Sequence, residues 1–98
     1  MEFKAAMVRL LTALKKNGNP TILVRSCFWP DKTKDEIMKQ ACSEVGGVYV
    51  DISELSKDGL NYAHAERTFA NNAVGIHPGD KGMEAIAIAL LDAIKKIR

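Results

Sequence analysis

Hydrophobic residues recur along this chain with two different periods, and these periods predict its elements. Residues 2–16 carry apolar side chains three or four positions apart, the spacing of an amphipathic helix. Residues 21–27 and 48–52 are short and almost continuously apolar, as expected for strands covered on both faces. Residues 53–72 are irregular or weakly helical in pattern. Residues 80–96 are again helical in period, and the side chains expected to be buried there are Met83, Ile86, Ala87, Leu90, Ile94 and Ile97.

Local signals mark where the helices begin and end. Gly18 and Pro20 end the first helix, because glycine accepts a left-handed cap and proline cannot continue a helix. Thr33 and Glu36 fit a capping box, with Thr33 as the N-cap of a second helix. The two glycines at residues 46–47 close that helix.

The order of elements is helix, strand, helix, strand, loop, helix. Alternation of helices with apolar strands implies an α/β fold, a parallel sheet with helices on both of its faces. The 98 residues are expected to form a single partial α/β domain. Two strands do not make a stable sheet, and the edge of the first would stay open. Further strands are therefore expected from an upstream segment or from another chain.

Composition excludes several classes of protein. The net charge is +2 with both signs mixed, so no polybasic nucleic-acid surface is expected. No apolar run is long enough to span a bilayer, and no signal peptide is visible, so the chain is cytoplasmic if Met1 is its true start. Cys27 and Cys42 lack metal-ligand spacing and are expected to be buried free thiols.

One loop carries the chemistry. His77 stands in a glycine-rich stretch, residues 75–82, directly before the last helix. In a parallel α/β sheet such a loop reaches the crevice beyond the carboxyl ends of the strands. An imidazole titrates near neutral pH and can take a proton from a hydroxyl there. The alternative is a histidine that only supports the loop. His64 is expected on a short helical turn at the surface.

His77-Pro78, followed by Gly82 and an aliphatic helix, resembles the last sequence block of the SGNH (GDSL-like) hydrolases. Residues 22–30 resemble the penultimate strand and loop of that family, and residues 48–52 its last core strand. The resemblance implies a flavodoxin-like three-layer α/β/α fold, of which this chain is the C-terminal half. It also implies a serine esterase acting on acyl or acetyl esters, including those of carbohydrates, with His77 as the catalytic general base. No metal or organic cofactor is implied.

The chain departs from that family in two respects. The family usually has an aspartate three residues before the histidine, where this chain has Val74. Either the base works without it, supported by a backbone carbonyl, or another carboxylate substitutes. The Gly-Asp-Ser nucleophile block and the oxyanion-hole residues are absent, so this chain alone is expected to be inactive. The candidate carboxylates are Asp51, Glu54, Glu66 and Asp80.

Two aromatic residues follow the first strand. Phe28 and Trp29 are predicted to bind substrate, with core packing as the alternative. Arg25 lies in an apolar run and is expected to have a partner, such as Asp51 or a substrate anion.

The expected partners are a small-molecule or carbohydrate ester, and either a second copy of the chain or a complementary N-terminal half. Neither nucleic acid nor membrane is expected. The rival hypothesis is a non-catalytic α/β module that associates with itself or a partner through its open sheet edge. A nucleotide-binding half-domain ranks below both, because no strand is followed by a glycine-rich phosphate loop.

Overall fold

The computed structural model describes residues 2–16, 18–68 and 72–97. The chain divides into two compact units, Met1–Asp51 and Ile52–Arg98. The first unit contains both strands, and the regular elements in the described part of the second are helical.

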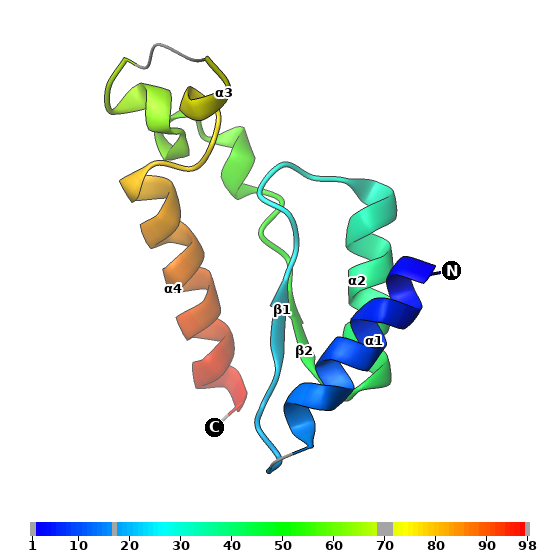
Figure 1. Ribbon diagram of the computed structural model, residues 1–98. Helices are drawn as coiled ribbons and strands as arrows, with labels where there is room; N and C mark the ends of the chain where they lie inside the picture. The colour runs from blue at the N-terminus through cyan, green and yellow to red at the C-terminus, as the bar shows by residue number, and fades with distance from the viewer. Residues whose placement is uncertain (1, 17, 69–71, 98) are drawn as a thin grey trace. The chain divides into compact units, whose positions relative to one another are not determined.

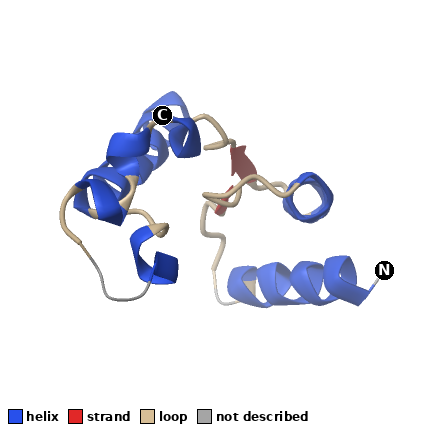
Figure 2. Ribbon diagram, turned by 90° about the horizontal axis from the view of Figure 1, so that it is seen from above, coloured by secondary structure: helices blue, strands red, loops and turns tan. Residues whose placement is uncertain are grey.

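The first unit is a strand–helix–strand motif preceded by a helix. Helix α1 spans Glu2–Lys15, strand β1 Leu23–Arg25, helix α2 Lys32–Glu44 and strand β2 Val48–Val50. The strands are parallel, and α2 makes the crossover between them. Both helices lie on the same side of the strand pair (Figure 1). In the view from above, α2 is seen nearly end-on and α1 from its side, so α1 crosses α2 obliquely (Figure 2).

The core of this unit lies where α1 and α2 meet the strands. Val24 pairs with Tyr49 in the middle of the parallel ladder. Two polar contacts tie α1 to α2 and its C-terminal turn: Lys4 Nζ lies 2.6 Å from a carboxylate oxygen of Glu44, and Lys15 Nζ donates to the Val45 carbonyl at 2.7 Å. The buried cluster consists of Leu11, Ile22, Val24, Ala41 and Cys42.

The predicted three-layer α/β/α fold is wrong for this chain. The sheet has only two strands of three residues each in the described residues, and most of those residues are helical. Both apolar runs predicted as strands are longer than the strands they form. A strand extends only as far as a neighbour pairs with its amides and carbonyls, and here each strand has one neighbour. The apolar pattern identifies the strands but carries no information on how many others lie beside them.

The second unit begins with three single-turn 3₁₀ helices, η1 Leu55–Lys57, η2 Gly59–Asn61 and η3 Ala63–Ala65. A one-turn helix, α3, follows at Asn72–Gly75, and the long helix α4 spans Asp80–Ile97. Residues 69–71, within the segment predicted to be irregular or weakly helical, lie outside the described residues.

The predicted start of α2 needs correction. Its N-cap is Asp31, an extended residue whose Oδ1 accepts the amide of Lys34 at 3.0 Å, and Thr33 already lies inside the first turn. The capping-box pattern therefore predicts a helix start two residues too late. Asp31 is equally suited to be an N-cap, and its side chain takes that role. The predicted end is confirmed, since Gly46 follows the C-cap with a φ of +71°.

Helix α4 buries a narrower face than its pattern predicts. Gly82 and Ile86 are buried and Leu90 is half-buried, whereas Met83 and Ile97 are 56% and 45% exposed. The helix contacts η2 through its glycine side, which turns the Met83 side outward. Within the described part of the chain, no helix combines the length and apolarity needed to cross a membrane.

Replacing Gly82 with alanine is expected to destabilise the protein. The new methyl group would meet the Asn61 carbonyl oxygen and lie 2.9 Å from Pro78 Cβ. Alanine favours a helix over glycine by about 1 kcal/mol, but the clash is with backbone and overpacking of this kind costs about 1–3 kcal/mol. We therefore expect a net fall of up to about 2 kcal/mol in the free energy of unfolding, measured in urea by circular dichroism.

Gly59→Ala is the matched control, because a methyl group there meets nothing within 4 Å and the glycine has no positive φ. Its unfolding midpoint should equal or slightly exceed that of the wild type. Equal stability of the two variants would contradict the close approach of α4 to η2.

Candidate functional site

His77 lies in the short connection between α3 and α4, and its backbone is fixed from both sides. Its carbonyl accepts the amide of Ala63 at 2.8 Å, and its own amide donates to the Val74 carbonyl at 3.3 Å. Two residues further on, the Gly79 amide donates to the Asn61 carbonyl at 3.0 Å. The loop therefore runs against the η2–η3 segment, while the His77 side chain is exposed.

The glycines at positions 75 and 79 allow the loop to pack closely against η3. Neither Gly75 nor Gly79 has a positive φ. A Cβ at Gly75 would lie 3.0 Å from His64 Cβ, and one at Gly79 would lie 2.9 Å from Ala63 Cα. A side chain at either position would push the His77 loop away from η3.

A hollow of about 330 Å³ opens beside His77, and its described lining belongs entirely to the second unit. Charged and apolar groups share this lining, so the hollow offers both a proton acceptor and hydrophobic surface. The side chains that matter for its chemistry are His77, Glu66, Arg67, Asp80, Val74 and Met83.

Glu66 lies in this hollow, but its carboxylate is engaged elsewhere. One oxygen accepts the amide of Lys81 at 2.9 Å and the other that of Asp80 at 3.1 Å. These two hydrogen bonds hold the pKa of Glu66 below its ordinary value. Because both oxygens cap α4, Glu66 is poorly placed to act as the carboxylate that orients His77.

The other candidate carboxylates have different surroundings. Asp51 belongs to the first unit, where it accepts a hydrogen bond from Ser26 Oγ at 3.5 Å. Glu54 is exposed and pairs with Lys57 at 3.0 Å. Asp80 lines the same hollow as His77. Of the four candidates, Glu66 and Asp80 line the hollow, and the Glu66 carboxylate is committed to the amides of α4, so Asp80 is the better placed to orient His77.

The aromatic residues predicted to bind substrate lie in the first unit, in the loop from β1 to α2. Phe28 is buried, with 7% of its surface exposed, and Trp29 is 42% exposed. Asp35 shapes this loop by accepting the amides of Cys27 at 2.9 Å and Asp31 at 3.1 Å. Burial alone would raise the pKa of Asp35, but these hydrogen bonds lower it overall. Substrate binding by the two aromatics stays a prediction.

Both cysteines are free thiols, as predicted. Cys42 is buried as predicted, whereas Cys27 is only half-buried. Burial raises the pKa of each thiol, and for Cys27 a hydrogen bond with Asp35 adds to the shift. A raised pKa leaves less thiolate at neutral pH, so neither cysteine has the character of a nucleophile.

Arg25 is exposed at the end of β1, contrary to the expectation of a charge within an apolar strand. Its Nη1 donates to the Ser26 carbonyl at 3.0 Å. The strand ends at Arg25, so its side chain reaches the surface and avoids the desolvation that the apolar run implied.

His64 lies on η3 at the surface, where the sequence placed it. Its ring stacks on Tyr62, with centroids 5.3 Å apart and planes inclined by 23°. In the described ranges, no three His, Cys, Asp or Glu side chains come together as metal ligands.

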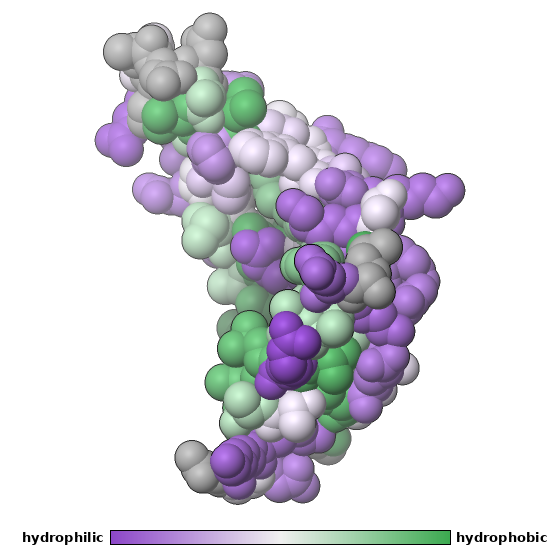
Figure 3. Space-filling model, turned by 45° about the vertical axis from the view of Figure 1, so that its right-hand side comes forward, coloured by the Kyte–Doolittle hydropathy of each residue, from purple (hydrophilic) through white to green (hydrophobic). Residues whose placement is uncertain are grey.

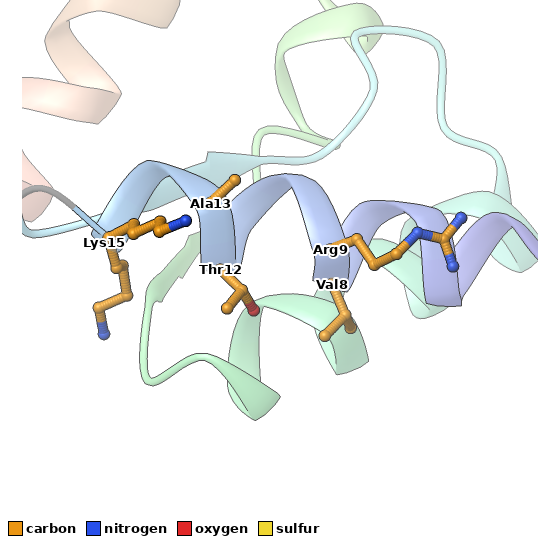
Figure 4. A pocket seen from close by; sticks show the side chains of 6 residues that line it. Val8, Arg9, Thr12, Ala13 and Lys15 are labelled. Carbon is orange, nitrogen blue, oxygen red and sulfur yellow. The ribbon is translucent and has the colours of Figure 1, made fainter.

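A second hollow, of about 570 Å³, lies along α1 (Figure 4). Val8 and Thr12 point to one side of the helix and Ala13 to the other. Arg9, Lys15 and Lys16 are its charged groups, and Lys15 is already bonded to a main-chain carbonyl. Its described lining contains the Thr12 hydroxyl but no carboxylate or histidine beside it that could act as a general base.

Hydrophobic residues are also exposed on the surface, where they lie among hydrophilic ones (Figure 3). On α1 the exposed apolar side chains fall at Phe3, Leu10 and Leu14, which are 43%, 60% and 57% exposed. Their spacing gives one stripe along the helix, beside the face that carries Leu11 into the core.

Sequence analysis identified Glu66 as a candidate carboxylate but did not predict that it caps α4. The usual signal for such a cap is an acidic residue within about three positions of the helix start. Glu66 precedes Asp80 by 14 residues, so no local pattern identifies it.

Comparison of the chain with models of protein families, with curated proteins and with solved structures gives no match.

Proposed function

We propose that this chain supplies the general base, His77, of a serine ester hydrolase that acts on acyl or acetyl esters of small alcohols or carbohydrates. One observation carries the proposal: an exposed imidazole stands beside a hollow of about 330 Å³, on a backbone held by hydrogen bonds on both sides. A general base needs this combination of access and fixed position.

The nucleophile comes from a complementary polypeptide in this proposal, because the chain has no Gly-Asp-Ser segment. The serine oxygen attacks the ester carbonyl as His77 takes its proton. The imidazolium then returns that proton to the departing alcohol, which leaves an acyl-serine. Water repeats the two steps and releases the carboxylic acid.

The surroundings of His77 suggest how it works without the usual aspartate. Val74, at the position of that residue, gives the hollow an apolar wall, and Glu66 is committed to α4. The base then acts in a serine–histidine dyad or with Asp80, which lines the same hollow. A dyad retains part of the rate enhancement of a triad.

The test is to tag the chain, isolate it with its native partners and assay hydrolysis of p-nitrophenyl acetate. His77→Ala is expected to lower kcat by about 100- to 10,000-fold, because general-base assistance is lost. His64→Ala is the matched control, since His64 is also an exposed histidine of the second unit and should change kcat less than twofold. A loss below tenfold for His77→Ala would sink the role of His77 as base.

A second reading of the same experiment concerns the nucleophile. A fluorophosphonate probe, which labels activated serines, should mark a co-purifying polypeptide and leave this chain unlabelled. Absence of any labelled serine from an active preparation would exclude the serine mechanism.

A second candidate function is favoured by the strands. β1 and β2 pair only with each other in the described residues, so each presents one edge without a neighbouring strand. Unpaired edges of this kind favour association with another chain. In this alternative the chain is a non-catalytic module that self-associates or binds a partner through its sheet.

Light scattering coupled to size exclusion separates the two candidates. Self-association predicts a concentration-dependent mass of about twice 10.7 kDa for the purified chain, with no ester hydrolysis. A mass of 10.7 kDa at every concentration tested would rule out self-association and leave a different partner chain as the complement.

A further inference from the structure

Glu66 joins two parts of the second unit that are distant in sequence. It follows η3, and its two carboxylate oxygens accept the amides of Asp80 and Lys81, 14 and 15 residues further along. The first amides of a helix have no acceptor within the helix. Glu66 therefore supplies, from outside α4, the acceptors that its first turn lacks.

These two bonds belong to a larger set of hydrogen bonds between residues 61–66 and residues 77–81, which we call the clasp. Two backbone hydrogen bonds from residues 61–66 complete it: the Ala63 amide donates to the His77 carbonyl, and the Asn61 carbonyl accepts the Gly79 amide. Hydrogen bonds thus hold the chain on both sides of the imidazole, before α4 and at its first turn. Among these hydrogen bonds, Glu66 contributes its side chain and the other partners contribute backbone groups, so Glu66 can be replaced without altering the backbone.

We propose that Glu66 is a positioning residue for His77: its carboxylate fixes the start of α4, and thereby the loop that presents the imidazole to the hollow. This inference rests on the proposed role of His77 as general base. Glu66 itself touches neither substrate nor the imidazole proton in this scheme. Its effect passes through the backbone of residues 77–81.

The His77 loop also packs directly against the Glu66 carboxylate. A Cβ at Gly79 would lie 2.8 Å from the Glu66 carboxylate, so the loop backbone and the carboxylate are in direct contact. Without the carboxylate, that contact and two amide acceptors disappear together. The loop can then move relative to η3 while α4 stays helical.

The same contacts fix the pH range over which the clasp holds. The amides of Lys81 and Asp80 stabilise the charged form of Glu66 and lower its pKa. A carboxylate with a lowered pKa in the folded state contributes stability above its unfolded pKa, and the contribution is lost as pH falls through the folded value. The contribution of the Glu66 carboxylate to the clasp is therefore present at neutral pH and lost in acid, while the backbone hydrogen bonds of the clasp do not titrate.

The test is nuclear magnetic resonance of the whole 98-residue chain, which does not depend on catalysis. In the wild type, the amide protons of Asp80 and Lys81 should shift together in acid, with a midpoint below the ordinary glutamate value of 4.5. Glu66→Gln, which is isosteric but uncharged, should abolish that shift and preserve the fold.

Glu66→Ala should make the Ala63 and Gly79 amides exchange with solvent about three- to thirtyfold faster, the range expected for loss of a helix cap. Glu84→Ala is the matched control, because Glu84 is an exposed glutamate on α4 itself and should leave both rates unchanged. If Glu66→Ala fails to fold, Glu66→Gln carries the same comparison. Unchanged exchange in both Glu66 variants would overturn the positioning role.

In the active complex, Glu66→Ala should lower kcat about tenfold or more and change KM by a smaller factor, because the base is misplaced while the rest of the lining of the hollow remains. Faster exchange with no loss of hydrolysis in His77→Ala would overturn the proposed function, and the positioning role with it. Loss of hydrolysis in His77→Ala with normal exchange in Glu66→Ala would overturn the role of Glu66 alone.

Discussion

The second unit depends on the close approach of two backbones, the start of α4 and the segment at residues 61–66. Glycine at positions 79 and 82 permits this approach, since a methyl group at either would meet main-chain atoms of that segment. The carboxylate of Glu66 then satisfies amides that the approach would otherwise leave without acceptors. Close packing and hydrogen bonding act together here, and they fix the backbone position of His77.

The first unit is built on a different principle. Its two short strands are stabilised by packing beneath α1 and α2, through a small cluster that includes Leu11 and Val24. Polar contacts to Glu44 and Val45 hold the helices together at the end of α2. A parallel pair alone is marginal, so the helices supply most of the apolar burial on which the strands depend.

The sequence predicted the helices and located both strands, because hydrophobic period and glycine or proline signals are local. The predicted size of the sheet was wrong, because the number of strands depends on which chain segments lie side by side. The apolar pattern of residues 21–27 is the same in a large sheet and in a small one. The sequence placed His77 in a loop directly before α4, because glycine and proline mark that loop. It could not assign the capping role of Glu66, which depends on a contact between distant positions, nor the exposure of Met83, which depends on the side of α4 that packs.

The single tryptophan adds a practical consequence. Trp29 is partly exposed in the first unit, while the second unit has Tyr62 and no tryptophan. Tryptophan fluorescence, excited at the red edge of the indole band, therefore reports on the first unit alone. Far-ultraviolet circular dichroism also has a large contribution from α4 in the second unit. Divergence between the two optical signals during unfolding would reveal that the halves of the chain melt as separate cooperative blocks, and coincidence that they melt as one.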